Sequence, residues 1–227
     1  MGHEDYSPEQ AVKYSKSRES FIETDAELFR AIEEIGGVSG NTVVDMGCGD
    51  GRHVSEIHKL GAAHVIGVDN SEAMIALTHE RLKDLNDVAL ITADARHLPL
   101  PDESVDKVFS NFVLHYFEDS KEIFNEISRV LKSRGYFIGS FNVTDVGPGY
   151  EHLVNTSMPI RLGGKDKAVV VHNLIKSKEE IETAIQQAAL TIIKTQELVH
   201  PNSVVDESFS DTDHVHKRAM MYVLQKN

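Results

Sequence analysis

The feature that most constrains the fold of this chain is a regular alternation of short apolar runs with amphipathic stretches, which begins at Thr42. The apolar runs are rich in Val, Ile and Phe and end at turn residues, a pattern typical of buried strands. The predicted strands are 42–46, 64–69, 88–93, 106–110 and 136–141. The predicted helices between them lie near 52–60, 71–85 and 119–131. This alternation favours right-handed crossovers and a buried parallel sheet of the α/β class.

The segments on either side of this core predict further elements. Capping boxes at 7–10 and 24–27, with Pro8 at the first helical position, indicate two helices before the core. Residues 142–176 interrupt the rhythm with several glycines and are interpreted as an excursion, partly loop. A helix capped by Ser177 comes next. The predicted elements that close the chain are strands over 190–198 and 219–224, separated by a polar, exposed segment over 201–217.

Length and composition are those of an ordinary globular domain. The chain has 227 residues, of which 41% are hydrophobic and 26% charged. No apolar run approaches the about 18 residues that a membrane-spanning helix needs, and the acidic N-terminus does not resemble a secretory signal. Cys48 is the only cysteine, which is typical of a reducing compartment, so a cytoplasmic protein without membrane contact is expected.

The formal net charge of −13 bears on possible partners. Such a surface repels phosphate backbones, and no dense run of Lys and Arg offsets it, so a nucleic-acid substrate is disfavoured. The charge is compatible with a cationic or neutral small molecule. Solubility alone also explains it.

The most informative segment is the one in which a predicted strand enters a turn with alternating glycines, Asp45-x-Gly47-x-Gly49-x-Gly51, and then a helix. Glycines suit such a turn because they adopt unusual dihedral angles and let a ligand approach the backbone. The N-terminus of the following helix presents unpaired N–H groups to that ligand. Taken alone, a turn of this kind is equally compatible with a purely structural role.

Two further acidic residues follow the next predicted strands. Asp69 ends the second strand and Asp94 follows the third. The carboxyl ends of parallel strands share one edge of a sheet, where open α/β sheets bind ligands. A carboxylate there can accept hydrogen bonds from both hydroxyls of a ribose. Together with the glycine turn, these acids predict a nucleoside pocket.

These residues resemble motif I and the following acidic positions of the class I S-adenosylmethionine-dependent methyltransferases. The segments 98–106, 110–117 and 126–135 are similar to those around the fourth and fifth strands of the small-molecule subgroup. The resemblance covers about residues 13–141. It implies a Rossmann-like, doubly wound α/β fold, with a seven-stranded, mostly parallel sheet and helices on both faces. The implied domain is single, 1–227, with a helical cap (1–40), a cofactor-binding core (41–141), a substrate-side insertion (142–176) and a C-terminal helix and strands (177–227).

The resemblance also implies how S-adenosylmethionine is held. Asp45 and the backbone of the glycine turn face its amino-acid end, Asp69 holds the ribose, and Asp94 contacts the adenine. An N-terminal helix closes over the cofactor, where Arg18 can pair with its carboxylate. The implied cofactor-binding residues are Tyr14, Arg18, Asp45, Gly47, Cys48, Gly49, Asp69, Asn70, Met74, Asp94, Ala95 and Asn111.

Methyl transfer from a sulfonium is an in-line displacement, so the protein must hold the acceptor atom about 3 Å from the methyl carbon. An acceptor hydroxyl also needs a nearby base. His115, just past the fourth predicted strand, is the best-placed titratable group, and Tyr116 is expected to orient the acceptor. A role in shaping the pocket is an alternative for His115. Tyr150, His152 and His172 are candidates for lining the acceptor site.

The expected reaction is methylation of an O or N atom of a small-molecule acceptor by a monomer or homodimer. The histidines form no recognisable metal-binding motif, so no metal is expected. A nicotinamide-dependent oxidoreductase is an alternative, but its Gly-x-Gly-x-x-Gly pattern is not matched, and Asp45 would repel a pyrophosphate. A non-catalytic, cofactor-binding partner protein is a second alternative, since a fold does not guarantee chemistry.

Overall fold

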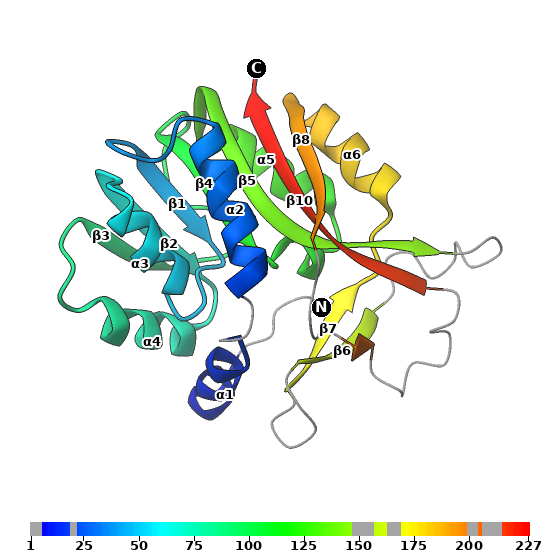
Figure 1. Cartoon of the computed structure of the whole chain (residues 1–227), viewed down its shortest axis with the longest axis horizontal. Helices are drawn as coiled ribbons and strands as arrows, with labels where there is room; N and C mark the ends of the chain where they lie inside the picture. The colour runs from blue at the N-terminus through cyan, green and yellow to red at the C-terminus, as the bar shows by residue number, and fades with distance from the viewer. Residues whose placement is uncertain (1–5, 19–21, 147–156, 163–168, 199–203, 206–214) are drawn as a thin grey trace.

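A computed structural model describes the backbone of residues 6–18, 22–146, 157–162, 169–198, 204–205 and 215–227, and side chains within 6–16, 25–144, 157, 173–198 and 218–227. A seven-stranded sheet in the order β3-β2-β1-β4-β5-β10-β8 forms its centre (Figure 1). The strands are β1 (Thr42–Met46), β2 (His64–Asp69), β3 (Val88–Thr92), β4 (Val105–Asn111), β5 (Leu131–Val146), β8 (Leu190–Leu198) and β10 (Val215–Lys226). β1 to β5 pair in parallel, and β10 runs antiparallel to β5 and β8. The predicted fold class is confirmed.

Helices cover both faces of this sheet. One face packs against α2 (Ile22–Glu34), α3 (Arg52–Lys59) and α4 (Glu72–Leu82), and the other against α5 (Ser120–Val130) and α6 (Lys178–Gln187). Two apolar clusters result, one on each face, as expected for parallel strands buried on both sides. In the described part of the chain, no helix is long and apolar enough to cross a membrane.

The order of the strands creates a switch point beside β1. β1 lies between β2 and β4, so the chain moves outward in one direction through β2 and β3 and in the other through β4 and β5. Ligands of open α/β sheets bind at the carboxyl ends of the strands at such a point. The glycine turn directly follows β1 and therefore lies in this position.

Several boundaries differ from the sequence-based expectation, although one predicted capping box is confirmed. The capping box at 7–10 forms as predicted, because the Ser7 N–H donates to Gln10 Oε1 at 2.9 Å and the Gln10 N–H donates to Ser7 Oγ at 3.3 Å at the start of α1 (Pro8–Arg18). The box predicted at 24–27 is wrong, because α2 already begins at Ile22. The predicted strand 136–141 is longer than expected, because β5 pairs with β10 from Tyr136 to Val146.

The excursion after β5 contains more strand than expected. A second sheet in the order β7-β6-β9 consists of β6 (Ser157–Leu162), β7 (Val169–Leu174) and β9 (Val204–Val205) (Figure 1). The prediction that 142–176 is partly loop missed these strands, and the segment 201–217 contributes β9 and the start of β10. β6 pairs with β9, more than 40 residues later in the chain. A pairing of that range leaves no local periodic signal.

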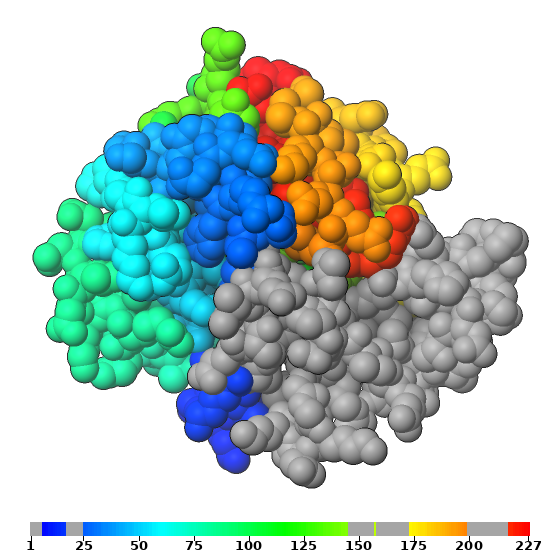
Figure 2. Space-filling view, in the orientation of Figure 1, coloured from blue at the N-terminus to red at the C-terminus, as the bar shows by residue number. Residues whose placement is uncertain are grey.

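Helix α2 is held against β8, the strand at one edge of the seven-stranded sheet. Figure 2 shows the surface of α2 beside that of β8. Lys194 Nζ lies 2.7 Å from Glu34 Oε2, and Gln196 Nε2 donates to Glu27 Oε2 at 2.9 Å. Leu28 and Ile32 of α2 are fully buried against the sheet. These contacts fix the position of α2. They therefore also fix the position of Asp25, the polar residue of α2 that lies near the ligand-binding edge of the sheet.

Candidate functional site

The glycine turn after β1 forms an open floor. Gly47 has φ +78° and Gly49 has φ +55°, values that residues other than glycine rarely adopt. A Cβ on Gly47 would lie 2.3 Å from Val113 Cγ2, so this glycine also permits close contact with the segment after β4. A Cβ on Gly49 would meet no atom within 4 Å. The space above Gly49 is therefore open to a ligand.

Asp69, at the end of β2, is fixed to this turn. The Gly49 N–H donates to Asp69 Oδ2 at 2.9 Å, and the Ser71 N–H donates to Oδ1 at 3.0 Å. Burial raises the pKa of the Asp69 carboxyl above its ordinary value, and these backbone hydrogen bonds oppose the shift. Each carboxylate oxygen has more than one lone pair, so the fixed side chain can also accept ligand hydroxyls.

A pocket opens above the turn and contains about 970 Å³ of empty space, part of it open solvent. The predicted residues that line it are Tyr14, Gly47, Cys48, Gly49, Asp69, Asn70, Met74, Asp94, Ala95, Asn111 and Tyr116. The structure thus brings together most of the cofactor-binding residues expected from the sequence.

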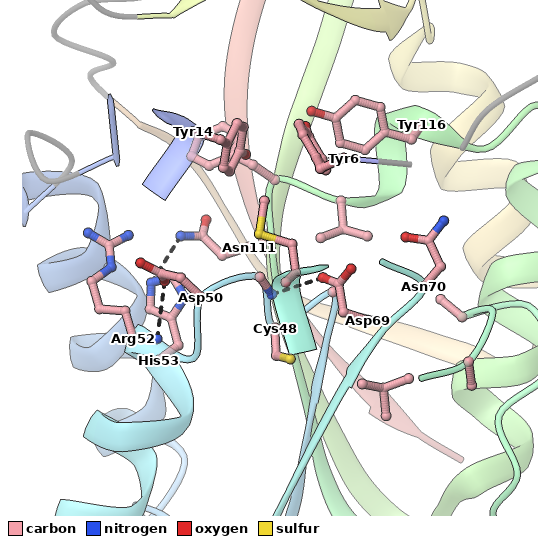
Figure 3. A pocket seen from close by; sticks show the side chains of 18 of the residues that line it. Tyr6, Tyr14, Cys48, Asp50, Arg52, His53, Asp69, Asn70, Asn111 and Tyr116 are labelled. Atoms are coloured by element: carbon pink, nitrogen blue, oxygen red, sulfur yellow. Dashed lines mark hydrogen bonds between the residues drawn. The ribbon is translucent and has the colours of Figure 1, made fainter. Parts of the chain in front are cut away.

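The pocket has two chemically different ends (Figure 3). Asp69 and Asn70 lie on one side, while Arg52, His53 and Asn111 lie on the other. The aromatic rings of Tyr6, Tyr14 and Tyr116 lie together above the floor between the two sides. The ring centroids of Tyr6 and Tyr14 are 5.2 Å apart.

Asp94 lines the pocket next to a cation. Arg96 NH2 lies 2.6 Å from Asp94 Oδ2, and the Arg96 N–H donates to Asp94 Oδ1 at 2.9 Å. The hydrogen bonds from Arg96 fix the direction of the carboxylate, as the glycine turn does for Asp69. Ala95 is 8% exposed and lines the same part of the pocket. The carboxylates of Asp69 and Asp94 are therefore both fixed in direction by hydrogen bonds.

Asp45 lies below the floor and not at the pocket surface. It is 1% exposed and is not among the lining residues, and within the described structure neither carboxylate oxygen has a hydrogen-bond partner. The alternation of side chains along β1 explains this, because Asp45 points to the same face as Val43, which packs against α2 and α3. Burial, with a smaller contribution from the charges of Asp69 and Asp50, raises the pKa of Asp45 to about 8. The expectation that its side chain faces a cofactor directly does not fit this position.

His115 is also set back from the pocket. It lies in the short 3₁₀ helix η1 (Leu114–Tyr116), is 2% exposed, and does not line the pocket. Its Nδ1 accepts a hydrogen bond from the Asn142 N–H at 3.3 Å, and its ring lies 4.5 Å from that of Tyr116. Tyr116 does line the pocket. The arrangement matches the alternative role for His115, that of shaping the pocket, better than the expected role of base.

Some expected residues lie outside the described parts of the structure. Arg18 ends α1, but its side chain is not described. Tyr150 and His152 lie outside the described residues, and His172 is described only as backbone in β7. Among the described side chains, no group of three or more His, Cys, Asp or Glu is placed to hold a metal ion.

Sequence analysis missed several residues of the pocket. Asp50, Arg52 and His53 directly follow the glycine turn, so their nearness to the turn was an available signal. Tyr6 and Ser15 come from the N-terminal region and gave no such signal. Ser15 Oγ donates a short hydrogen bond to Asp50 Oδ2, which ties α1 to the turn. Arg81 NH2 lies 2.7 Å from the same carboxylate and adds α4 to the contact.

The switch point, the glycine turn and the rigid acids at neighbouring strand ends define a Rossmann-like domain with a nucleoside-binding pocket. The family model described as "Methyltransferase domain" matches residues 44–139, which contain most of that pocket. A crystal structure of an S-adenosylmethionine-dependent methyltransferase from Mesorhizobium loti superimposes with a TM-score of 0.62 at 20% identity, covering 87% of this chain and 96% of that chain. Residues 44–139 therefore match a methyltransferase domain, and the chain has the fold of the S-adenosylmethionine-dependent methyltransferases.

Two of the curated relatives show how much of the chain is matched. An uncharacterized chloroplastic methyltransferase of Arabidopsis thaliana is 32% identical over 139 residues, which are 58% of this chain and 40% of that protein. A malonyl-acyl-carrier-protein O-methyltransferase of Marinomonas sp. is 34% identical over 101 residues, which are 44% of this chain and 37% of that protein. The chain thus spans well under half the length of either relative.

Proposed function

We propose that this protein transfers the methyl group of S-adenosylmethionine to an O or N atom of a small-molecule acceptor. The observation that carries the proposal is the pocket at the switch point, where the glycine turn, Asp69, Asp94 and Asn111 meet. The open space above Gly49 fits a bound nucleoside, because a Cβ there would meet no protein atom within 4 Å. The cofactor supplies the electrophilic methyl group when it is bound.

The residues on the side of the pocket that contains Asp69 and Asn70 hold the adenosine. Asp69 accepts hydrogen bonds from the ribose hydroxyls, since its carboxylate is already fixed by Gly49 and Ser71. Asn70 and Met74 flank the adenine, and Ala95 and Asp94 contact its edge. The backbone carbonyl of Asn111 accepts from the methionyl ammonium at the opposite end. Asp45 lies beneath the floor and does not contact the cofactor.

The acceptor binds beneath the aromatic rings between these two ends. Tyr6, Tyr14 and Tyr116 line the pocket there, and Tyr14 comes from α1, which is tied to the turn through Ser15 and Asp50. These rings exclude water and direct the acceptor atom along the line of the S–CH3 bond. Tyr116 contacts the acceptor, and the His115 ring packs against the Tyr116 ring. An acceptor bound in this way needs a free lone pair but no covalent link to the protein.

Incubation with methyl-labelled S-adenosylmethionine and a metabolite extract tests this function. We expect label in a small molecule, on oxygen or nitrogen, and we expect the variant Asp69→Asn to lose most of that label. Label on carbon would contradict the acceptor atom, and label only in macromolecules would contradict the acceptor class. Tight cofactor binding without any transfer would support a non-catalytic partner protein, the second candidate.

The assembly and the location are parts of the same proposal. The protein acts as a monomer or homodimer of a single domain in the cytoplasm, as its one cysteine suggests. The chloroplastic location in the name of the Arabidopsis relative is a reason to test the second point. Sedimentation of the purified protein and microscopy of a tagged copy measure both properties. A larger assembly or an organellar signal would contradict them.

A further inference from the structure

A buried carboxylate from α2 lies behind the end of the pocket opposite Asp69. Asp25 is 8% exposed, and its Oδ1 lies 3.1 Å from His53 Nε2 and accepts from Asn111 Nδ2 at 3.1 Å. Arg52 NH1 lies 3.2 Å from its Oδ2. His53 and Asn111 are themselves 9% and 8% exposed. One carboxylate therefore joins the start of α3 to the end of β4.

This cluster fixes Asn111 on both sides of its amide. Its Nδ2 donates to Asp25, and its Oδ1 accepts a short hydrogen bond from Ser140 Oγ of β5. A buried charge is costly unless it is paired and hydrogen-bonded, and Asp25 meets that condition because these partners converge on it. The conformation of the chain at Asn111 is thus linked to the position of α2.

The cluster faces the pocket through its partners. Arg52, His53 and Asn111 line the pocket, whereas Asp25 does not, so Asp25 influences a ligand only through them. In Figure 3 these lining residues lie on the side away from Asp69 and Asn70. Because the Arg52 guanidinium lines the pocket while it is paired with Asp25, its charge is held where a ligand carboxylate can meet it.

We propose that Asp25 is a positioning residue that holds Arg52, His53 and Asn111 against the amino-acid end of the cofactor. This inference rests on the proposed function. It assigns the carboxylate of the cofactor to Arg52 and the ammonium to the Asn111 carbonyl, with Asp25 setting both positions. Asp25 then determines affinity for the amino-acid part of the ligand and has little influence on affinity for the adenosine part.

Calorimetry with two nucleosides separates this role from a merely structural one. S-adenosylhomocysteine carries the amino-acid part, and 5′-methylthioadenosine lacks it. We expect Asp25→Asn to weaken binding of S-adenosylhomocysteine by about tenfold or more and that of methylthioadenosine by less than about threefold. Titration to millimolar concentration quantifies the weaker ligand. Glu33→Gln, on an exposed position of the same helix, is the matched control and is expected to change neither affinity.

The outcomes distinguish this inference from the proposed function. Equal weakening of both nucleosides, or no weakening of S-adenosylhomocysteine, would overturn the role of Asp25 and leave the proposed function intact. Failure of the unmodified protein to bind either nucleoside would overturn both. If a thermal melt shows that Asp25→Asn does not fold, His53→Gln carries the same comparison, because it removes the imidazole contact with Asp25.

Discussion

The two ends of the pocket are built in different ways. On the side where we propose that the adenosine binds, Asp69 accepts from Ser71 and Asp94 accepts from Arg96, in each case a residue two positions further along the chain, and Asp69 also accepts from Gly49, 20 positions earlier. At the other end, Asp25 reaches His53 and Asn111 across 28 and 86 positions. The first end is formed by local turns on a sheet edge, and the second depends on how α2, α3, β4 and β5 pack together. The two sides of the pocket are therefore built by two kinds of structure, and we expect them to differ in sensitivity to mutation.

A substitution in the glycine turn, which lies beneath both sides of the pocket, should have the largest effect. Gly47→Ala places a side chain in a left-handed conformation and brings its Cβ to 2.3 Å from Val113 Cγ2. The conformation costs about 1–2 kcal/mol and overpacking about 1–3 kcal/mol, so we expect a loss of about 2–5 kcal/mol in the free energy of unfolding. Urea denaturation measures this loss.

Two companion variants show whether the contact with Val113 is responsible. Gly49→Ala has a positive φ but no atom within 4 Å of the new Cβ, so it should cost about 1–2 kcal/mol from conformation alone. Val113→Ala in the Gly47→Ala background should recover part of the loss. A Gly49→Ala variant as unstable as Gly47→Ala would argue against the steric explanation.

Asp45 lies under the floor and should affect stability in a pH-dependent way. Its pKa is about 8 in the folded protein, against about 3.9 in an unfolded chain, so between these values the folded state holds a proton that the unfolded state releases. Stability from this group is complete below about pH 4 and falls as the pH rises toward 8, by about 1.4 kcal/mol per pH unit. From pH 5 to pH 7 the loss is about 2–3 kcal/mol.

Asp45→Asn removes the titrating group and should flatten this dependence. Denaturation of the variant and the unmodified protein at pH 5, 6 and 7 gives the difference directly, because other groups contribute equally to both. Parallel pH curves for the two proteins would show that Asp45 does not retain its proton in the folded state.

The smallest predicted effect concerns the relative affinities for two nucleosides, one with and one without the amino-acid part. Asp69→Asn should weaken binding of S-adenosylhomocysteine and methylthioadenosine alike, by about 1–3 kcal/mol, because both ligands carry the ribose. Asp25→Asn is expected to affect only the first ligand strongly. Calorimetry with both nucleosides sharpens the comparison, and a loss confined to S-adenosylhomocysteine in Asp69→Asn would reverse the assignment of the two ends.

The difference between the ends also explains what the sequence could predict. The meeting of Asp69 and Asp94 in one pocket was predictable because both residues follow strands that show as β-branched runs, beside a turn whose glycines stand at fixed spacing. The strand order then brought these residues to one edge. The prediction for Asp45 identified the right segment but not the direction of the side chain, which the alternation along β1 decides.

The remaining features depend on contacts between distant segments. Nothing near Asp25 in the sequence indicates that α2 places it beside His53, and nothing near β6 indicates its pairing with β9. His115 was expected at the pocket because it follows β4, but η1 turns its ring toward the backbone of β5. Local patterns cannot specify such contacts, because they join segments that are far apart in the chain.

A structure of the protein crystallised with S-adenosylhomocysteine tests the whole account most directly. We expect the ribose hydroxyls within hydrogen-bond distance of the Asp69 carboxylate and the amino-acid group beside Arg52 and the Asn111 carbonyl, with the sulfur facing the tyrosine rings. A nucleoside bound in the reverse direction, or bound away from the glycine turn, would contradict the account.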